Sequence, residues 1–226
     1  GHCLPMPEGI SLTDAAGLPE TFFTVWSNVF LGAGSLEGKH LLVHGGAGGI
    51  GSTAIQLGAA FGLRVFATAG SSESCRFCVD LGAEKAINYH NEDFVEIVRA
   101  AGGADIIIDI VGGDYIARNI KAARPDARII QLAFNKGSKV ELELMPVMLK
   151  RLTYTGSTLR SRPDAFKSAI ASDLGEKVWP LFAADKLRAV THAVLPFAQA
   201  ARAHDMLQAG GHRGKVLLTP EASPSR

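Results

Sequence analysis

Short apolar runs alternate with helical patterns through the first two thirds of the 226-residue chain. The apolar runs predict strands at residues 40–44, 64–69, 85–88, 104–111 and 128–133. Between them the patterns predict helices at 49–61 and 74–81, one capped by Asn91, and one at 115–123. Runs that are almost wholly apolar are typical of strands covered on both faces. This alternation predicts an α/β fold with a doubly wound parallel sheet.

The two ends of the chain follow other patterns. Residues 19–31 place apolar side chains at helical spacing behind a proline, which suits the first position of a helix. We expect extended segments at 140–144 and 152–156, a long helix at 163–182, and then a strand at 189–195, a helix at 197–208 and a strand at 214–219. Residues 221–226 are small or polar and are expected to fray.

A glycine-rich turn follows the first predicted strand directly, and residues 46–51 satisfy the pattern G-x-G-x-x-G. In this pattern the first glycine makes the tight turn and the second lets the backbone approach a pyrophosphate. The third lets the helix pack on the strand. The following helix also presents free N–H groups to phosphates. We therefore expect a dinucleotide to bind at Gly46, Ala47, Gly48, Gly49, Ile50 and Gly51.

Composition argues against several classes of protein. A formal net charge of +1 gives no basic surface for nucleic acid. The sequence has no stretch of about 18 apolar residues, so it predicts no membrane span. Three cysteines do not make a disulfide framework, which favours a reduced, cytoplasmic protein. Cys75 and Cys78 are interpreted as two small side chains on one helix face rather than as a redox or zinc motif.

The histidines do not form a recognisable metal motif. His40 and His44 lie on one predicted strand, where four residues span about 13 Å, too far for two ligands of one metal. We expect His44 to hydrogen-bond to backbone at the end of its strand, and we expect no metal site.

Several stretches together resemble one family. They are Leu18–Trp26, Val43–Gly51, Ala67–Ala83 and Ala209–Val216. They are similar to the zinc-independent quinone oxidoreductase branch of the medium-chain dehydrogenase/reductase superfamily, nearest to its tumour-suppressor-inducible group. The resemblance runs over about residues 3–220 and implies a Rossmann cofactor domain at 18–188, entered by a lead-in at 1–17. It also implies that residues 189–220 return to an N-terminal β-rich substrate domain, so that the chain is the C-terminal part of a longer protein.

The end of the second strand bears on the choice of cofactor. NAD-binding folds place a carboxylate there for the ribose 2′-hydroxyl, whereas residues 69–71 read Ala-Gly-Ser. Without a carboxylate to repel a 2′-phosphate, NADPH is favoured. The family commonly has lysine where this chain has Ser74, and Glu73 opposes a phosphate, so NADH stays an alternative. The candidate contacts at this end are Gly70, Ser71, Ser74, Tyr89 and Arg213.

The resemblance implies hydride transfer from NADPH to a quinone or a related enone. It places Val111, Gly112, Phe134 and Leu159 near the nicotinamide and its ribose, although core or loop packing is the alternative for the three larger side chains. Thr24 would lie at the reactive face and is the single catalytic candidate. No acid–base constellation is required, because orienting donor and acceptor supplies much of the rate.

Partners follow from the same resemblance. It implies a homodimer formed through an edge strand within residues 140–156, where Val140, Leu142 and Leu144 alternate. The acceptor pocket would lie between two domains, so this chain alone is expected to turn over little. An enoyl reductase of the same superfamily and a non-enzymatic NADPH-binding module are the alternative functions.

Overall fold

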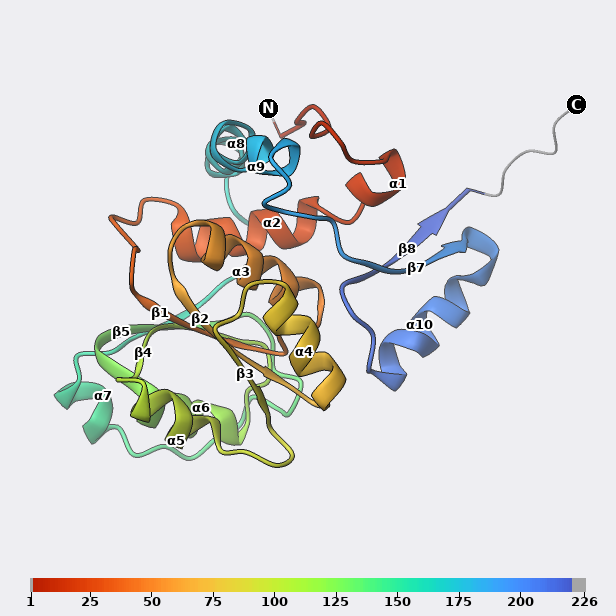
Figure 1. Ribbon diagram of the computed structural model, residues 1–226. Coiled ribbons are helices and arrows are strands. Elements are labelled where there is room, and N and C mark those ends of the chain that lie inside the picture. Colours follow the sequence, from red (N-terminus) through yellow and green to blue (C-terminus); the bar gives the residue numbers. More distant parts are fainter. Residues whose placement is uncertain (1, 221–226) are drawn as a thin grey trace, which may run out of the picture.

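A computed structural model describes residues 2–220, in which a six-stranded parallel sheet has the order β3-β2-β1-β4-β5-β6 (Figure 1). The strands are β1 (His40–His44), β2 (Arg64–Ala69), β3 (Lys85–Asn88), β4 (Ala104–Asp109), β5 (Ala123–Gln131) and β6 (Thr153–Gly156). The order reverses between β1 and β4, which is the arrangement of a doubly wound sheet. The predicted fold class is therefore confirmed, and ligands of such sheets bind at this reversal.

Helices cover both faces of the sheet and enclose two apolar cores (Figure 1). One face carries α2 (Pro19–Val25), α3 (Gly49–Ala60), α4 (Ser72–Asp80), α8 (Asp164–Asp173) and α9 (Trp179–Ala183). The other face carries α5 (Phe94–Ala100) and α6 (Asp114–Ala122). Short elements complete this part of the chain: α1 (Leu12–Ala15) and α7 (Met145–Leu149), with the π-helical turns η1 (Trp26–Phe30) and η2 (Leu174–Val178). Strands buried on both faces explain the apolar runs seen in the sequence.

Two local predictions were wrong. Asp93, not Asn91, caps α5, because the Asp93 carboxylate accepts the Val95 N–H at 2.7 Å. Residues 140–144 form no strand. Their alternating apolar side chains face one cavity of about 380 Å³ beneath α6 and β5. Val140 and Leu144 are exposed at this cavity, so the alternation reflects side chains that share one direction and not pairing with a neighbouring strand.

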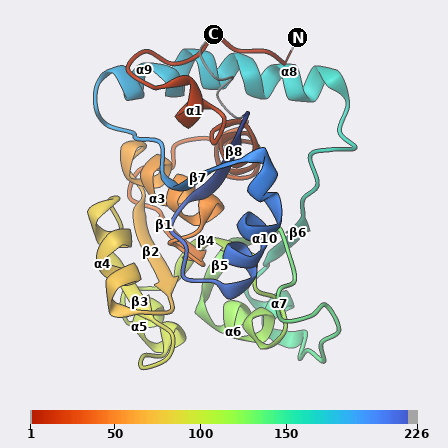
Figure 2. The ribbon, with the colours of Figure 1, turned by 90° about the vertical axis from the view of Figure 1, so that its right-hand side faces the viewer.

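A small arm follows the main sheet. It consists of β7 (Thr191–Pro196), the short turn η3 (Phe197–Gln199), α10 (Ala200–Ala209) and β8 (Lys215–Thr219). The strands β7 and β8 pair in parallel as a separate sheet, and Figure 2 shows the arm in front of the carboxyl ends of the main strands. A bridge between Gly48 and Gly214 joins the arm to the glycine turn. The predicted frayed tail, 221–226, lies outside the described residues.

Candidate functional site

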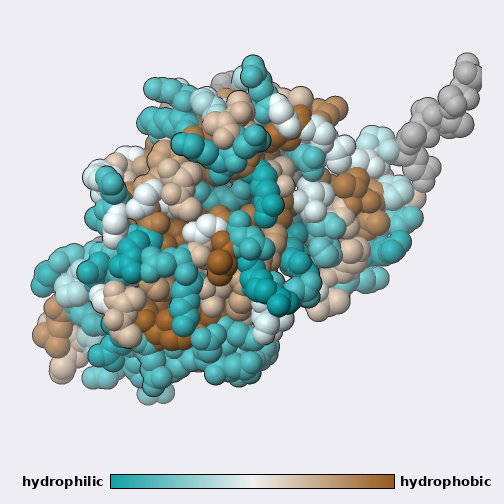
Figure 3. Space-filling view, viewed as in Figure 1, coloured by the Kyte–Doolittle hydropathy of each residue, from teal (hydrophilic) through white to brown (hydrophobic). Residues whose placement is uncertain are grey.

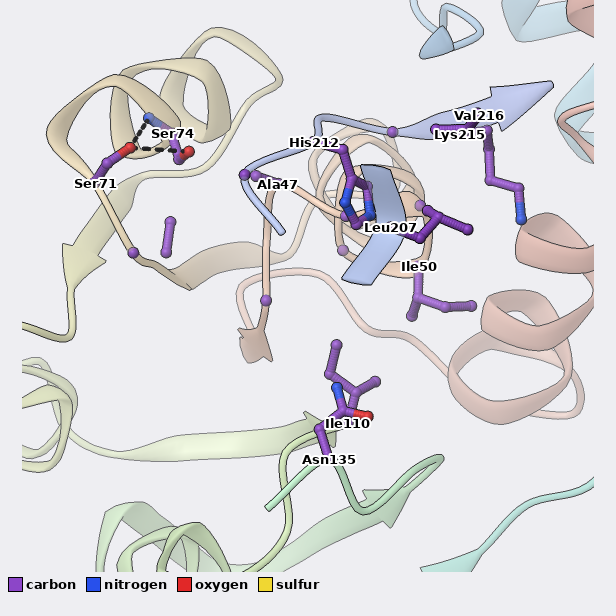
Figure 4. Close-up of a pocket in the computed structure, with 18 of the residues that line it drawn as sticks. Ala47, Ile50, Ser71, Ser74, Ile110, Asn135, Leu207, His212, Lys215 and Val216 are labelled. Carbon is purple, nitrogen blue, oxygen red and sulfur yellow. Dashed lines mark hydrogen bonds between the residues drawn. The ribbon is translucent and has the colours of Figure 1, made fainter. Parts of the chain in front are cut away.

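A cleft of about 570 Å³ opens where β1, β2 and β4 end (Figure 4). Its walls are formed mainly by the glycine turn after β1, the end of β2, the loops after β4 and β5, and the loop before β8. This position coincides with the reversal of strand order, so the topology itself places the cleft where doubly wound sheets bind ligands.

The glycine turn leaves the first turn of α3 open to the cleft. Gly48 caps α3 in an extended conformation, and no side chain hydrogen-bonds to the first amides of the helix. A side chain at Gly51 would overlap the Gly45 carbonyl oxygen, so only glycine lets the helix approach the strand this closely. A side chain at Gly48 would meet nothing closer than 3.5 Å. Packing therefore does not require glycine at position 48, and no side chain there covers the first amides of α3.

Hydroxyl groups gather at the end of β2. Ser71 caps α4: its Oγ accepts the Ser74 N–H at 3.1 Å and donates to the Ser74 hydroxyl at 3.1 Å (Figure 4). A Cβ added to Gly70 would come within 2.5 Å of the Tyr89 hydroxyl, so Tyr89 lies directly against this strand end. The helix N-terminus and these hydroxyls together offer hydrogen-bond donors to an anionic group.

The loop before β8 closes the cleft from the opposite side. Its backbone is fixed to the glycine turn by the Gly214 N–H, which donates to the Ala47 carbonyl at 2.8 Å. Two ion pairs lie here: Arg213 of the loop pairs with Glu73, and Lys215, the first residue of β8, pairs with Glu20 at 3.1 Å. Arg213 therefore lies beside α4, near the two serines, and Lys215 lies over the start of α3.

His212 projects from the same loop into the region of the cleft (Figure 4). Burial lowers the pKa of His212, and the neighbouring His192 and Lys215 lower it further. The Nδ1 atom of His212 is buried and has no hydrogen-bond partner among the described residues. A neutral imidazole therefore lines this wall of the cleft at neutral pH.

The predicted contacts divide into two sets. Those that line the cleft are Ala47, Gly48, Gly49, Ile50, Gly51, Gly70, Ser71, Ser74 and Tyr89. Those outside its lining are Thr24, Gly46, Val111, Gly112, Phe134, Leu159 and Arg213.

The second set has identifiable packing positions. Gly46 is wedged against Ala67 and Cys78, where a Cβ would approach to 2.8 Å and 2.9 Å. Phe134 faces the apolar cavity beside α6, and Leu159 lines an apolar groove of about 770 Å³ next to the N-terminal segment. The Thr24 carbonyl accepts a hydrogen bond from the Asn28 amide at 2.8 Å.

Sequence reasoning missed several lining residues. After β4 and β5 the cleft is lined by Ile110 and Asn135, each adjacent to a predicted residue. Side chains alternate in direction along extended backbone, so an error of one residue selects the opposite face. The remaining missed residues come mostly from the arm and from the strand ends: Glu20, Gly45, Ala69, Leu207, Gly211, His212, Gly214, Lys215 and Val216. Gly211 and Gly214, on either side of His212 in the sequence, were the feature from which the arm's contribution to the cleft could have been predicted.

Two other sequence interpretations can be compared with the structure. Cys75 and Cys78 lie on α4, and burial together with Cys75 raises the pKa of the Cys78 thiol to about 12. His44 does not bond to backbone as expected: it is buried between the Thr68 hydroxyl and the Asn119 amide oxygen.

Within residues 2–220 no group of three or more His, Cys, Asp or Glu side chains could hold a metal ion. No helix in that range is long and apolar enough to cross a membrane.

Comparisons with known proteins agree with this architecture. The model of the zinc-binding dehydrogenase family matches residues 49–173. Quinone oxidoreductase of Rattus norvegicus is 28% identical over 221 residues, which are 95% of this chain and 64% of that protein. A highly reducing polyketide synthase of Gibberella zeae is 26% identical over 97% of this chain and 9% of its own length. This chain thus spans less than two thirds of the curated quinone oxidoreductases it matches.

Solved structures give the same result. The quinone oxidoreductase of Thermus thermophilus, solved also with NADPH, has a TM-score of 0.82 at 29% identity, over 95% of this chain and 69% of that one. An NAD-dependent alcohol dehydrogenase has a TM-score of 0.83 at 33% identity, over 96% and 61%. The CurK enoyl reductase has a TM-score of 0.79 at 28% identity, over 96% and 65%. The chain belongs to the zinc-binding dehydrogenase family, as the cofactor domain of a zinc-independent, quinone oxidoreductase-type medium-chain dehydrogenase/reductase.

Proposed function

We propose that the cleft binds NADPH and that the chain is the cofactor-binding part of a reductase acting on quinones or related enones. The observation that carries this proposal is the uncapped first turn of α3 beneath Gly48, which is open to the cleft. Amides with no partner in the helix, at the positive end of its dipole, suit a diphosphate. The solved quinone oxidoreductase with NADPH supports the same cofactor.

The end of β2 supports NADPH over NADH in this proposal. Ser71 and Ser74 offer hydroxyls next to the N-terminus of α4, and Arg213 brings a guanidinium to the same corner. A 2′-phosphate accepts hydrogen bonds from all of these groups, and an arginine contact is strong because it is charge-assisted. Glu73 opposes the phosphate, but its carboxylate is already paired with Arg213.

The chain's own residues bind and orient rather than transfer protons. The bound nicotinamide would supply the hydride for the reaction. In our proposal, Gly48, Gly49 and Ile50 hold the diphosphate, while Ile110 and Asn135 form the floor at the other end of the cleft. Thr24, Val111, Gly112, Phe134 and Leu159 remain candidates for the nicotinamide end and the acceptor. An upstream β-rich domain would complete the acceptor pocket, and residues 189–220 would pack against it.

A direct titration tests the cofactor. NADPH fluorescence should rise and saturate on titration with the chain, with NADH binding about tenfold or more weakly, since one charged phosphate contact separates the two. Steady-state NADPH oxidation with 1,2-naphthoquinone should be weak or undetectable for this chain alone. Equal affinity for the two nucleotides would reject the NADPH assignment, and no binding of either would reject the site.

An enoyl reductase is the second candidate function. The polyketide synthase relative and the CurK enoyl reductase structure favour it, because both match over nearly the whole chain. Both reductases would use the same cleft and differ in the acceptor. Assaying the protein that contains this chain with crotonyl thioester and with naphthoquinone separates them.

We also propose that two copies pair along β6 and function in the cytoplasm, where the free thiols of Cys3, Cys75 and Cys78 stay reduced. β6 is an edge strand, and an uncovered edge favours association. Apolar side chains surround it: Leu144, Met145, Met148, Leu149 and Tyr154 are exposed. Figure 3 shows apolar atoms at the α7 corner, among other apolar areas on this face.

A further inference from the structure

A row of buried polar side chains runs beneath the floor of the cleft, and the binding proposal does not use it. Its central members, Thr68, His44, Asn119 and Asp109, are at most 1% exposed. They come from β2, β1, α6 and β4, so the row crosses the sheet at the carboxyl ends of three strands. Buried polar groups are costly unless they are paired, so a row of this length needs an explanation.

Each hydrogen bond of the row has one consistent direction. The Asn119 amide nitrogen donates to Asp109 Oδ2 at 2.9 Å, so the Asn119 oxygen faces His44 and accepts from its Nε2 at 2.7 Å. His44 Nδ1 is then an acceptor, and the Thr68 hydroxyl donates to it at 3.1 Å. The network thus assigns one neutral tautomer to His44. Phe94 and Tyr115 pack edge-on against the imidazole, with ring centroids 4.7 Å and 4.8 Å away.

The two ends of the row hold opposite walls of the cleft. At one end the Thr68 hydroxyl accepts the Gly45 N–H at 3.4 Å, in the glycine turn. At the other end Asp109 Oδ1 accepts the N–H groups of Val111 and Gly112 at 2.6 Å and 3.0 Å, in the loop after β4. The diphosphate side and the nicotinamide side of the cleft are therefore connected by side chains that do not line it.

The row also has a branch toward the edge of the sheet. Gln131 at the end of β5 donates through its amide to the Asp109 carbonyl at 3.3 Å and accepts from the Tyr154 hydroxyl at 2.6 Å. The row and its branch thus include side chains from five strands, β2, β1, β4, β5 and β6, and Asp109 holds the loop that follows β4.

We propose that Thr68, His44, Asn119 and Asp109 act together as positioning residues that set the separation of the two cleft walls, and hence the fit of a whole dinucleotide. Hydrogen-bond chains in a dry interior reinforce one another, so breaking one link loosens the far end. If the row were only structural, breaking it would lower the stability of the fold without a selective loss of affinity for a whole dinucleotide. The choice of NADPH as the ligand rests on the proposed function. The hydrogen-bonded connection between the two walls is independent of that proposal.

Thr68 offers a matched pair of variants. Thr68→Val removes the hydroxyl at nearly constant shape, whereas Thr68→Ser keeps it. In the ligand-free chain we expect amide hydrogen exchange in Thr68→Val to rise about threefold or more at Gly45 and also at Val111 and Gly112. Thr68→Ser should stay near wild type. A rise confined to the glycine turn would overturn the connection between the walls.

A comparison of two ligands tests the fit. The fragment 2′,5′-ADP would occupy the β2 side and the glycine turn only, whereas NADPH would also reach the loop after β4. In Thr68→Val and in Asn119→Leu the NADPH dissociation constant should rise about fivefold or more, while that of 2′,5′-ADP changes less than about twofold. Parallel losses for both ligands would overturn the positioning role. If wild-type protein binds neither ligand, the proposed function fails, and hydrogen exchange still decides whether the row connects the walls.

Discussion

Arg213, in the loop before β8, reaches α4 and forms a salt bridge with Glu73, with Nη2 and Oε1 2.5 Å apart. The residues are 140 positions apart in the sequence. The pair joins the arm to the helix whose N-terminus carries Ser71 and Ser74, at the corner where we place the 2′-phosphate. In the described structure the carboxylate thus holds the cation that the phosphate would use.

Removing the carboxylate should increase the preference for NADPH. Glu73→Gln frees Arg213 and eliminates a negative charge beside the 2′-phosphate, so NADPH should bind about three- to fivefold more tightly, a modest gain because both side chains are partly exposed to solvent. NADH affinity should stay the same, because that cofactor lacks the phosphate. Fluorescence titration measures both.

Glu84→Gln is the matched control for Glu73→Gln. Glu84 also pairs with an arginine, Arg64, but Arg64 begins β2, at the opposite end of that strand from Ser71 and Ser74. This variant should leave both affinities unchanged. Equal gains for NADPH and NADH in Glu73→Gln would show that the 2′-phosphate does not bind near Glu73.

Two glycines of the turn should respond differently to alanine. In Gly48→Ala the new methyl group has room in the fold, because φ is −73° and the nearest atom is 3.5 Å away, but it would project over the open amides of α3. We expect near-wild-type stability and NADPH binding weakened about tenfold or more. In Gly51→Ala the methyl group collides with backbone and should cost about 3 kcal/mol of stability.

Urea denaturation and NADPH titration on both variants check this contrast. If Gly48→Ala binds as well as wild type, the diphosphate does not rest on these amides, and the proposed cofactor site is wrong. If Gly51→Ala is as stable as wild type, the close packing of α3 on the turn is not what requires glycine there.

Local patterns predicted most of the main sheet but little of the arm's contribution to the cleft. The apolar runs gave all five of the strands expected within residues 40–133, and the glycine pattern gave the turn. The contact of Gly214 with Ala47 joins segments that no local pattern relates. Ile110, which lines the cleft, was missed next to the predicted Val111, because a strand end fixed only to within one residue leaves the side-chain direction open.

His44 should make stability depend on pH in the mildly acidic range. Burial lowers its pKa below the ordinary 6.5, although Asp109 and the Asn119 hydrogen bond act in the opposite direction and Arg118 lowers it further. The folded chain therefore binds this proton less readily than the unfolded chain. Stability is full above about pH 6.5 and falls as the pH drops toward the folded-state pKa, by up to about 1.4 kcal/mol per pH unit.

Urea denaturation between pH 5 and pH 7.5 measures this dependence. His44→Gln should be less stable at pH 7.5 and should show a flatter profile, because the titrating group is gone. His90→Gln, at an exposed position, should keep the wild-type slope. A wild-type slope in His44→Gln would mean that another group governs stability in this range.

The cysteines should differ strongly in reactivity. Cys3 is exposed, Cys75 is intermediate, and Cys78 is buried with its pKa raised to about 12. Because the thiolate is the reacting form, iodoacetamide at pH 8 should modify Cys3 first, Cys75 slowly and Cys78 only after unfolding. Mass spectrometry of the modified peptides gives the order. Rapid modification of Cys78 in the native chain would contradict the interpretation of this C-x-x-C as helix packing.

The α7 corner should determine the oligomeric state. Met148 and Leu149 are 68% and 65% exposed beside the uncovered edge strand β6, an arrangement that favours burial against a second copy. By light scattering, wild type should have twice the chain mass of 23.9 kDa. Met148→Lys combined with Leu149→Lys should give the monomer, because a dimer would have to bury two charges on each chain. Val79→Lys, at an exposed apolar position on α4, should leave the dimer intact. A monomeric wild type, or a double variant that stays dimeric, would mean that copies do not pair through this corner.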